Sequence, residues 1–290
     1  MRLGIVILPE YRWAQARPLW VAAEEYGFAH AWTYDHLSWR TLADGPWFGA
    51  LPTLTAAAAV TNRIRLGTMV TSPNYRHPVP LAKDLMTIDD VSNGRLLVGM
   101  GAGGVGFDAT VLGGEVLPPQ RRAERFEEFV ELLDSLLRRP RTDYAGNYFQ
   151  AVDARMIPAS VQQPRPHFIV AANGPRLMRL AARFGQGWVT TGTTEGADGL
   201  AAWWDGVAEL SDRFTETLGT AGRKADAVDR YLMVDATGRA ALSSVDFFED
   251  CLGRAAELGF TDLLVHWPRA EGVYAGSEAV LQAVAPGRSG

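Results

Sequence analysis

Short apolar runs alternate with longer amphipathic segments along the whole chain. Runs of the first kind predict strands, at Leu3–Leu8, His30–Thr33, Ile64–Val70, Leu96–Gly99, Phe168–Ala172, Gly187–Val189, Arg230–Val234 and Asp262–His266. Segments of the second kind predict helices, at Arg17–Tyr26, Pro52–Val60, Pro78–Asp90, Arg121–Arg138, Arg176–Phe184, Leu200–Leu218, Val245–Leu258 and Ser277–Val284. Most of the strands are nearly continuous in apolar residues, as expected where helices cover a parallel sheet. Eight strands, each followed by a helix, predict an α/β fold of the closed (β/α)8 TIM-barrel type.

One segment lies outside this alternation. Four prolines punctuate the stretch from Pro140 to Pro166, and Tyr144–Phe149 resembles a hairpin turn. We therefore expect an insertion between the fourth helix and the fifth strand, within a single domain that spans residues 1–290. A glycine that can adopt the left-handed cap follows three of the predicted helices, at Gly27, Gly185 and Gly259.

Composition narrows the class of protein. Of the 290 residues, 47% are apolar and the formal net charge is −5. The chain has no block of basic residues, so we expect no nucleic-acid partner. It also has no run of about 20 apolar residues and no signal-peptide pattern, so we expect a cytoplasmic protein without a membrane contact.

The cysteine and histidine positions give no metal pattern. A single cysteine, Cys251, excludes an internal disulfide framework and is expected to be a small apolar residue in a helix. Three of the histidines lack a carboxylate or a second histidine at ligand spacing, namely His30, His77 and His167. We expect no metal site.

Polar residues follow the second predicted strand, where Asp35-His36 comes directly after Tyr34. In parallel α/β proteins the carboxyl ends of the strands carry the chemistry. A histidine there can exchange protons near neutral pH, and Asp35 is expected to hold its ring or the polar edge of a cofactor. The alternative is a histidine that only caps the following turn. Trp39 and Trp47, in the next loop, are candidates for an aromatic substrate pocket or for plain packing.

Two later segments also have a special backbone. Gly101–Gly106 has the spacing of a dinucleotide-binding fingerprint, but no helix opens after it, so we interpret it as a backbone-exposing loop. Asn173-Gly174-Pro175 precedes a helix and can offer unpaired N–H groups to an anion, although a plain capped helix start is the alternative. His266 ends the last strand and is a candidate substrate contact.

Several motifs together resemble the luciferase-like (bacterial luciferase) superfamily of oxidoreductases, particularly those that use coenzyme F420, a deazaflavin. The resemblance covers Leu3 to about Gly192. It is carried by the motifs that follow in order, Ala22-x-x-Glu25-x-Gly27-Phe28, Asp35-His36, Thr61-Asn62-Arg63-Ile64-Arg65-Leu66-Gly67-Thr68, Ser92-Asn93-Gly94-Arg95, Gly99-Met100-Gly101-Ala102-Gly103 and Ala171-Ala172-Asn173-Gly174-Pro175.

The resemblance implies a TIM barrel with its cofactor at the carboxyl ends of the strands. It implies a bulge with a non-proline cis peptide at Met69-Val70, after Thr68, which supports the cofactor ring. It also implies that the loop with Gly101 and Gly103 lies over the cofactor. The cofactor phosphate would be held by four residues of two later loops, Asn173, Gly174, Gly192 and Thr193.

By this resemblance we expect an enzyme that transfers a hydride between coenzyme F420 and a small organic substrate such as an imine or an activated alkene. His36 would exchange the accompanying proton. One alternative is an FMN-dependent monooxygenase that uses reduced flavin and oxygen; Asp35-His36 favours F420, because many such monooxygenases have Glu-His-His there. A second alternative is a cofactor-free binding barrel. The expected partners are a second copy in a homodimer and a separate cofactor reductase.

One departure from the family concerns the substrate. The deazaflavin sugar-phosphate dehydrogenases that resemble this chain carry a glutamate in the glycine loop, where this chain has about Gly104, with Asp108 the nearest carboxylate. They also hold the substrate phosphate with basic residues in a later loop, where this chain has Thr193-Thr194-Glu195. A phosphorylated sugar is therefore a poor candidate substrate.

Overall fold

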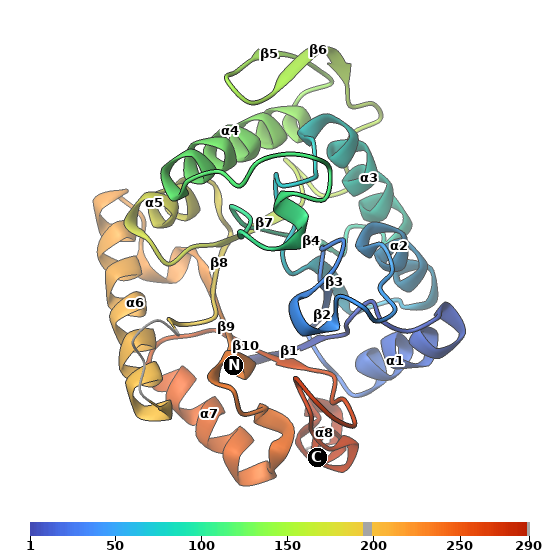
Figure 1. The fold of residues 1–290 in the computed structure, drawn as a ribbon, viewed down its shortest axis with the longest axis vertical. Helices are drawn as coiled ribbons and strands as arrows, with labels where there is room; N and C mark the ends of the chain where they lie inside the picture. Colours follow the sequence, from blue (N-terminus) through green and yellow to red (C-terminus); the bar gives the residue numbers. More distant parts are fainter. Residues whose placement is uncertain (194–198, 289–290) are drawn as a thin grey trace. The chain divides into compact units, whose positions relative to one another are not determined.

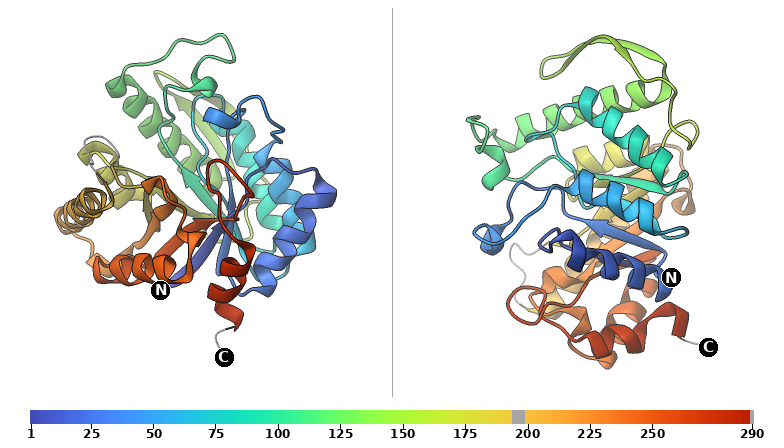
Figure 2. Two further views of the ribbon diagram at one scale, coloured as in Figure 1. Left: turned by 60° about the horizontal axis from the view of Figure 1, so that its bottom comes forward. Right: turned by 90° about the vertical axis from the view of Figure 1, so that its right-hand side faces the viewer.

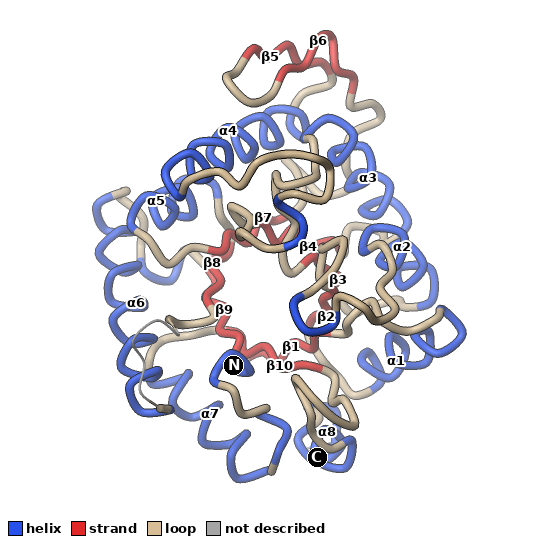
Figure 3. Tube along the Cα trace, in the orientation of Figure 1, coloured by secondary structure: helices blue, strands red, loops and turns tan. Residues whose placement is uncertain are grey.

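A computed structural model describes residues 1–193 and 199–288. Eight parallel strands close into a barrel in the order β1-β10-β9-β8-β7-β4-β3-β2 (Figure 3). Their bounds lie within two residues of the predicted strands, at β1 Arg2–Val6, β2 His30–Thr33, β3 Arg65–Thr68, β4 Leu96–Met100, β7 His167–Ala171, β8 Gly187–Thr190, β9 Asp229–Met233 and β10 Asp262–His266. The predicted (β/α)8 barrel is confirmed.

The eight predicted helices are all present (Figure 1). They are α1 Trp13–Glu25, α2 Ala50–Val60, α3 Pro78–Val91, α4 Pro119–Arg138, α5 Pro175–Phe184, α6 Leu200–Thr220, α7 Val245–Glu257 and α8 Glu278–Val284. The largest difference from the expected bounds is at α1, which begins four residues before Arg17 and contains Pro18.

Backbone contacts divide the chain into two compact units. The first unit comprises Met1–Leu8, Leu19–Trp32 and Ile169–Gly290, and the second comprises Pro9–Pro18 and Thr33–Phe168. The expectation that residues 1–290 form a single domain stays a prediction.

In the first unit, aromatic side chains fill the space between strands and helices. The ring of Trp188, on β8, stacks on Phe214 of α6 with a centroid distance of 4.5 Å. Its indole N–H donates to the carbonyl of Ala172 at 2.6 Å, which satisfies its only polar atom. Burial on both faces explains why these strands have apolar residues at almost every position.

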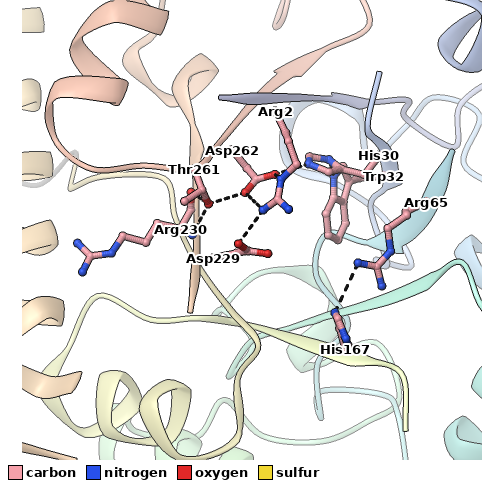
Figure 4. Close-up of polar contacts among 9 residues, drawn as sticks. All are labelled: Arg2, His30, Trp32, Arg65, His167, Asp229, Arg230, Thr261 and Asp262. Carbon is pink, nitrogen blue, oxygen red and sulfur yellow. Dashed lines mark hydrogen bonds and ion pairs between the residues drawn. The ribbon is translucent and has the colours of Figure 1, made fainter. Parts of the chain in front are cut away.

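A buried polar network joins β1, β2 and β10 at their amino-terminal ends (Figure 4). Asp262, which is fully buried, accepts hydrogen bonds from Arg2 at 2.7 and 2.6 Å and from His30 Nε2 at 2.8 Å. The Trp32 indole donates to His30 Nδ1 at 2.7 Å, which defines the neutral tautomer of this imidazole. His30 therefore has a structural role.

In the second unit, Arg95 connects a helix with the start of a strand. Its guanidinium donates to the carbonyls of Ala58 and Thr61, at the end of α2, and to the carbonyl of Ile64, before β3. The nearby motif residues Asn93 and Gly94 both have positive φ and form the tight turn into β4. These motifs therefore stabilise the amino-terminal end of the strands.

The predicted insertion is an antiparallel hairpin, β5 Arg141–Ala145 and β6 Gln150–Arg155, which forms a sheet of its own and supplies no barrel strand. It lies along the outer side of α4 (Figure 2). The carboxylate of Glu128, on α4, accepts hydrogen bonds from three consecutive backbone N–H groups of the hairpin turn, those of Asn147, Tyr148 and Phe149.

Two of the three predicted glycine caps are confirmed. Gly27 and Gly259 have φ values of 82° and 78°. The prediction is wrong for Gly185, whose φ is −77°. Glycine is required there by close contact instead, since a Cβ would lie 2.7 Å from the carbonyl oxygen of Ala181.

Cys251 is buried in α7, and burial raises the pKa of its thiol to about 12. Within residues 1–193 and 199–288, no helix is both long and apolar enough to cross a bilayer. The same residues contain no group of three or more His, Cys, Asp or Glu side chains arranged to hold a metal ion.

Replacing Asp262 with asparagine should destabilise the protein in a pH-dependent manner. Burial opposes its charge, but hydrogen bonds from His30, Arg2 and Thr261 outweigh this effect and hold the pKa of Asp262 below its ordinary value. The carboxylate's contribution to stability is therefore fully present above about pH 3.9 and is lost as the pH falls through the lower folded-state value. We expect Asp262→Asn to lower the free energy of unfolding by about 3 kcal/mol at pH 7, because it leaves a buried pair broken.

Urea unfolding at pH 7 and pH 3 measures this difference, which should shrink at the lower pH. Asp229→Asn is the matched control, because Asp229 also binds Arg2, at 2.8 Å, but is partly exposed. It should cost less than about 1 kcal/mol. An equal loss in both variants would contradict the assigned role of Asp262.

Candidate functional site

The carboxyl ends of β2, β3 and β4 lie side by side in the second unit. The N–H of Met69, after β3, donates to the carbonyl of Thr33, the last residue of β2, at 2.8 Å. On the other side, the N–H of Thr71 donates to the carbonyl of Gly99 at 2.8 Å, and the N–H of Gly101 donates to the carbonyl of Thr71 at 2.9 Å. Residues that follow these three strands are therefore brought into one place.

His36 and Asp108 form a close pair there. His36 Nδ1 lies 2.5 Å from Asp108 Oδ2, and the N–H of Leu37 donates to Asp108 Oδ1 at 2.8 Å. Because a carboxylate can only accept a hydrogen bond, Nδ1 carries the proton. Nε2 is then the ring nitrogen that is left to exchange a proton with another group. Among the described residues, Nε2 has no hydrogen-bond partner, and the side chain of His36 is 18% exposed.

The expectation that Asp35 orients the ring of His36 is wrong. Asp35 is fully buried, and its carboxylate accepts hydrogen bonds from Tyr75 Oη at 2.6 Å and from Arg76 at 2.6 and 3.1 Å. These donors hold the carboxylate away from the ring, and Asp108 occupies the expected position. A role for Asp35 at a cofactor edge stays a prediction.

The sequence does not identify Asp108 as the partner of His36. It lies in a short 3-10 helix, Phe107–Ala109, within the long connection between β4 and α4. The available signal was its rarity, because Asp108 and Glu115 are the only carboxylates between Gly101 and Pro118.

The predicted cis peptide after β3 is confirmed, since the Met69-Val70 bond is cis. The hydroxyl of Thr68 donates to the carbonyl of Gly99 at 2.7 Å and so serves the sheet. Directly after the cis bond, the hydroxyls of Thr71 and Ser72 are buried without a hydrogen-bond partner among the described residues.

The segment with Gly101 and Gly103 is a loop, as expected, and no α-helix begins between Gly101 and Pro118. Gly103 has a φ of 79°, and a Cβ at this position would lie 2.5 Å from Oδ1 of Asn74. The carbonyl of Gly103 accepts a hydrogen bond from Arg122 at 3.2 Å. A side chain other than hydrogen at position 103 would therefore require the loop to move.

The candidate phosphate residues lie in the first unit. Asn173 uses its side chain within the protein, because Nδ2 donates to the carbonyl of Gly192 at 3.0 Å and Oδ1 accepts from Thr190 at 2.7 Å. Gly174 precedes the first turn of α5, and a Cβ placed on it would meet no atom within 4 Å. Thr193 is half-buried, whereas Thr194 and Glu195 lie outside the described residues.

The aromatic candidates differ in their surroundings. The ring centroids of Trp39 and His36 lie 4.3 Å apart, and the indole N–H of Trp47 donates to the carbonyl of His36 at 2.8 Å. His266, in the first unit, is buried; its Nδ1 lies 2.8 Å from Asp235, and its ring stacks on Tyr274 at 3.5 Å. Its contact with a substrate stays a prediction.

Comparison with known proteins identifies relatives of this chain. Over 217 residues the chain is 32% identical to an F420-dependent glucose-6-phosphate dehydrogenase of Nocardia farcinica, which covers 74% of this chain and 62% of that protein. The chain spans about half to three fifths of the length of the curated dehydrogenases of this name.

Two solved structures are similar over most of the chain. The monooxygenase RslO1 from Streptomyces bottropensis has 26% identity and a TM-score of 0.69, covering 89% of this chain and 77% of that one. The coenzyme F420-dependent tetrahydromethanopterin reductase from Methanopyrus kandleri has 20% identity and a TM-score of 0.75, covering 99% and 97%, and shares the fold. A model of the luciferase-like monooxygenase family matches residues 1–272, so the chain belongs to that family.

Proposed function

We propose that the protein is an oxidoreductase that transfers a hydride between coenzyme F420 and a small organic substrate. The observation that carries this proposal is the His36–Asp108 pair, in which Asp108 leaves His36 Nε2 as the nitrogen that can exchange a proton. A histidine held in one tautomer suits general acid–base chemistry. Action as a homodimer, with a separate cofactor reductase and in the cytoplasm, is part of the same proposal.

The residues present suit a bound deazaflavin. Thr71 and Ser72 have buried hydroxyls in need of partners, and they follow the end of β3. The open space at Gly174 leaves the first turn of α5 accessible to an anion, as a cofactor phosphate requires. When bound, the reduced deazaflavin supplies the hydride. In the second unit, Thr71, Ser72 and the 101–103 loop are proposed to contact its ring. In the first unit, Gly174, Gly192 and Thr193 stay predicted contacts of a cofactor phosphate.

Two observations bear on the identity of the cofactor. The name of the Nocardia farcinica relative and the Asp35-His36 sequence favour F420. The 26% identity to the monooxygenase RslO1 favours the alternative, a monooxygenase that uses FMN. A barrel that binds neither cofactor is the second alternative. Fold alone does not separate the three, because one fold serves many activities.

We propose a neutral, apolar substrate such as an activated alkene or an imine. The loop that carries Asp108 exposes five apolar side chains to solvent, those of Val105, Phe107, Val111, Leu112 and Val116. It contains no lysine or arginine between Gly101 and Pro118. Such a surface favours apolar compounds and offers a phosphate no cation. Glucose 6-phosphate, named for the relatives, is therefore a poor substrate for this chain.

Replacing Gly174 with glutamate should weaken F420 binding. The added carboxylate would stand among the N–H groups of the first turn of α5 and repel the cofactor phosphate. We expect F420 to bind more tightly than FMN to the wild type and at least about tenfold more weakly to Gly174→Glu. Fluorescence titration with each cofactor measures this, and Gly174→Ala is the matched control, because its Cβ meets nothing. Equal affinity for FMN, or unchanged F420 binding by the glutamate variant, would count against the proposal.

Replacing His36 with alanine should reduce turnover about 10²–10⁴-fold, the usual contribution of general acid–base catalysis. Affinity for F420 should change little, because other residues are proposed to hold the cofactor. The pH–rate profile of the wild type should have a limb that reports the proton exchange, and His36→Ala should lack it. Loss of cofactor with full turnover at saturation would make His36 a binding residue instead.

Lengthening an apolar substrate should increase kcat/KM. With reduced F420 and a series of 2-alkylcyclohex-2-en-1-ones, we expect about a three- to fourfold rise per methylene, as for burial of apolar surface. Leu112→Ser should flatten this series, and Val152→Ser, an exposed valine on β6, should not. Faster reaction with glucose 6-phosphate and oxidised F420 would refute the substrate class.

A further inference from the structure

Three consecutive residues between β3 and α3 contact two different parts of the candidate site. Tyr75 and Arg76 donate three hydrogen bonds to the carboxylate of Asp35. Asn74 Nδ2 donates to the carbonyl of Gly104 at 3.1 Å, and its Oδ1 accepts from Arg125 at 2.5 Å. We call Asn74, Tyr75 and Arg76 the 74–76 clamp.

The two targets of the clamp flank the His36–Asp108 pair. Asp35 directly precedes His36, and Gly104 lies in the same loop as Asp108, four residues earlier. The pair itself joins residues 72 positions apart in the sequence. One short segment therefore contacts a residue on each side of the pair, the carboxylate of Asp35 next to His36 and the carbonyl of Gly104 in the loop of Asp108.

The contacts that Tyr75 and Arg76 make with Asp35 are of the strong, directional kind. Asp35 is fully buried, and its bonds from Arg76 are charge-assisted. Burial, followed by the negative charge of Asp35, raises the pKa of Tyr75, so the phenol stays protonated and remains a donor. On the other side, Gly103 lies so close to the Asn74 amide that a Cβ would collide with it.

We propose that the 74–76 clamp positions the His36–Asp108 pair. Tyr75 and Arg76 fix the position of His36 through Asp35, and Asn74 fixes that of Asp108 through Gly104. Among the described residues, no hydrogen bond or ion pair joins Asn74 or Arg76 to His36 or Asp108, so both are positioning residues. The catalytic meaning of this role rests on the proposed function, because an imidazole displaced by a fraction of an ångström transfers protons less effectively.

Proton NMR of the imidazole N–H groups tests the clamp without any cofactor. The His36 Nδ1 proton, assigned by its absence in His36→Ala, should resonate far downfield in the wild type. Asn74→Ala should shift it upfield or broaden it beyond detection. Two other imidazoles with carboxylate partners, those of His30 and His266, are internal controls and should keep their resonances.

A matched variant separates positioning from general destabilisation. Gln162→Ala removes hydrogen bonds to Asp89 and to the carbonyl of Leu96, elsewhere in the second unit, and should lower the Tm without moving the His36 resonance. Tyr75→Phe removes one of three donors to Asp35 and should give a smaller shift than Asn74→Ala. An unmoved His36 resonance in folded Asn74→Ala, or an equal shift in Gln162→Ala, would overturn the proposal.

Kinetics then test the link to catalysis. With F420, Asn74→Ala should lower kcat about 10- to 100-fold and change the Kd for the cofactor less than about twofold. In the His36→Ala background it should lower kcat no further, because it acts through that side chain. A further loss there would overturn positioning through His36. If the resonance responds to the clamp but no variant turns over with F420, the proposed function fails and the positioning role stands.

Discussion

The contact between His36 and Asp108 is the constraint on which the candidate site depends. It joins the end of one strand to a long connection 72 residues away. A single carboxylate with two acceptor oxygens serves both the ring of His36 and the backbone N–H of Leu37, so it sets the ring's tautomer and its orientation together. Without Asp108, Nδ1 of His36 would lose the one hydrogen-bond partner that it has among the described residues.

The two ends of the strands are stabilised in different ways. At the amino-terminal ends, polar groups are satisfied within the protein, by Asp262 in the first unit and by Arg95 in the second. At the carboxyl ends, Asp35 and Thr68 are also satisfied, but the hydroxyls of Thr71 and Ser72 have no hydrogen-bond partner among the described residues. Satisfied polar groups add stability, and unsatisfied ones are costly unless a ligand completes them. This difference agrees with the placement of chemistry at the carboxyl ends in barrels of this type.

Much of the fold could be predicted from the sequence, because its signals are local. Apolar runs such as His30–Thr33 specify strands wherever both faces are covered, and the prolines around the β5–β6 hairpin mark it as an insertion. The family resemblance correctly indicated the cis bond at Met69-Val70. The predicted left-handed cap at Gly185 was wrong. Glycine is required there because a Cβ would collide with the carbonyl oxygens of Ala181 and Gly187, a close contact that no local sequence pattern shows.

The partners within the site could not be predicted in the same way. Asp35 is adjacent to His36 in sequence, yet Tyr75 and Arg76 bind it, and Asp108 replaces it at the ring. Competition among donors for a buried carboxylate depends on three-dimensional distances that no local pattern encodes. For His266, the position at a strand end was correct, but burial against Asp235 and Tyr274 was not visible in the sequence.

The attachment of the insertion has a consequence for how such chains can change. The turn of the β5–β6 hairpin depends on one carboxylate of α4, Glu128, and the hairpin contributes no strand to the barrel. The residues that follow it are tied down separately, by Gln162 to Asp89 and by Arg165 to Asp134. The hairpin can thus change in length, or carry a grafted label or recognition sequence, at the expense of its own attachment to Glu128, while the strands that present His36 keep their pairing.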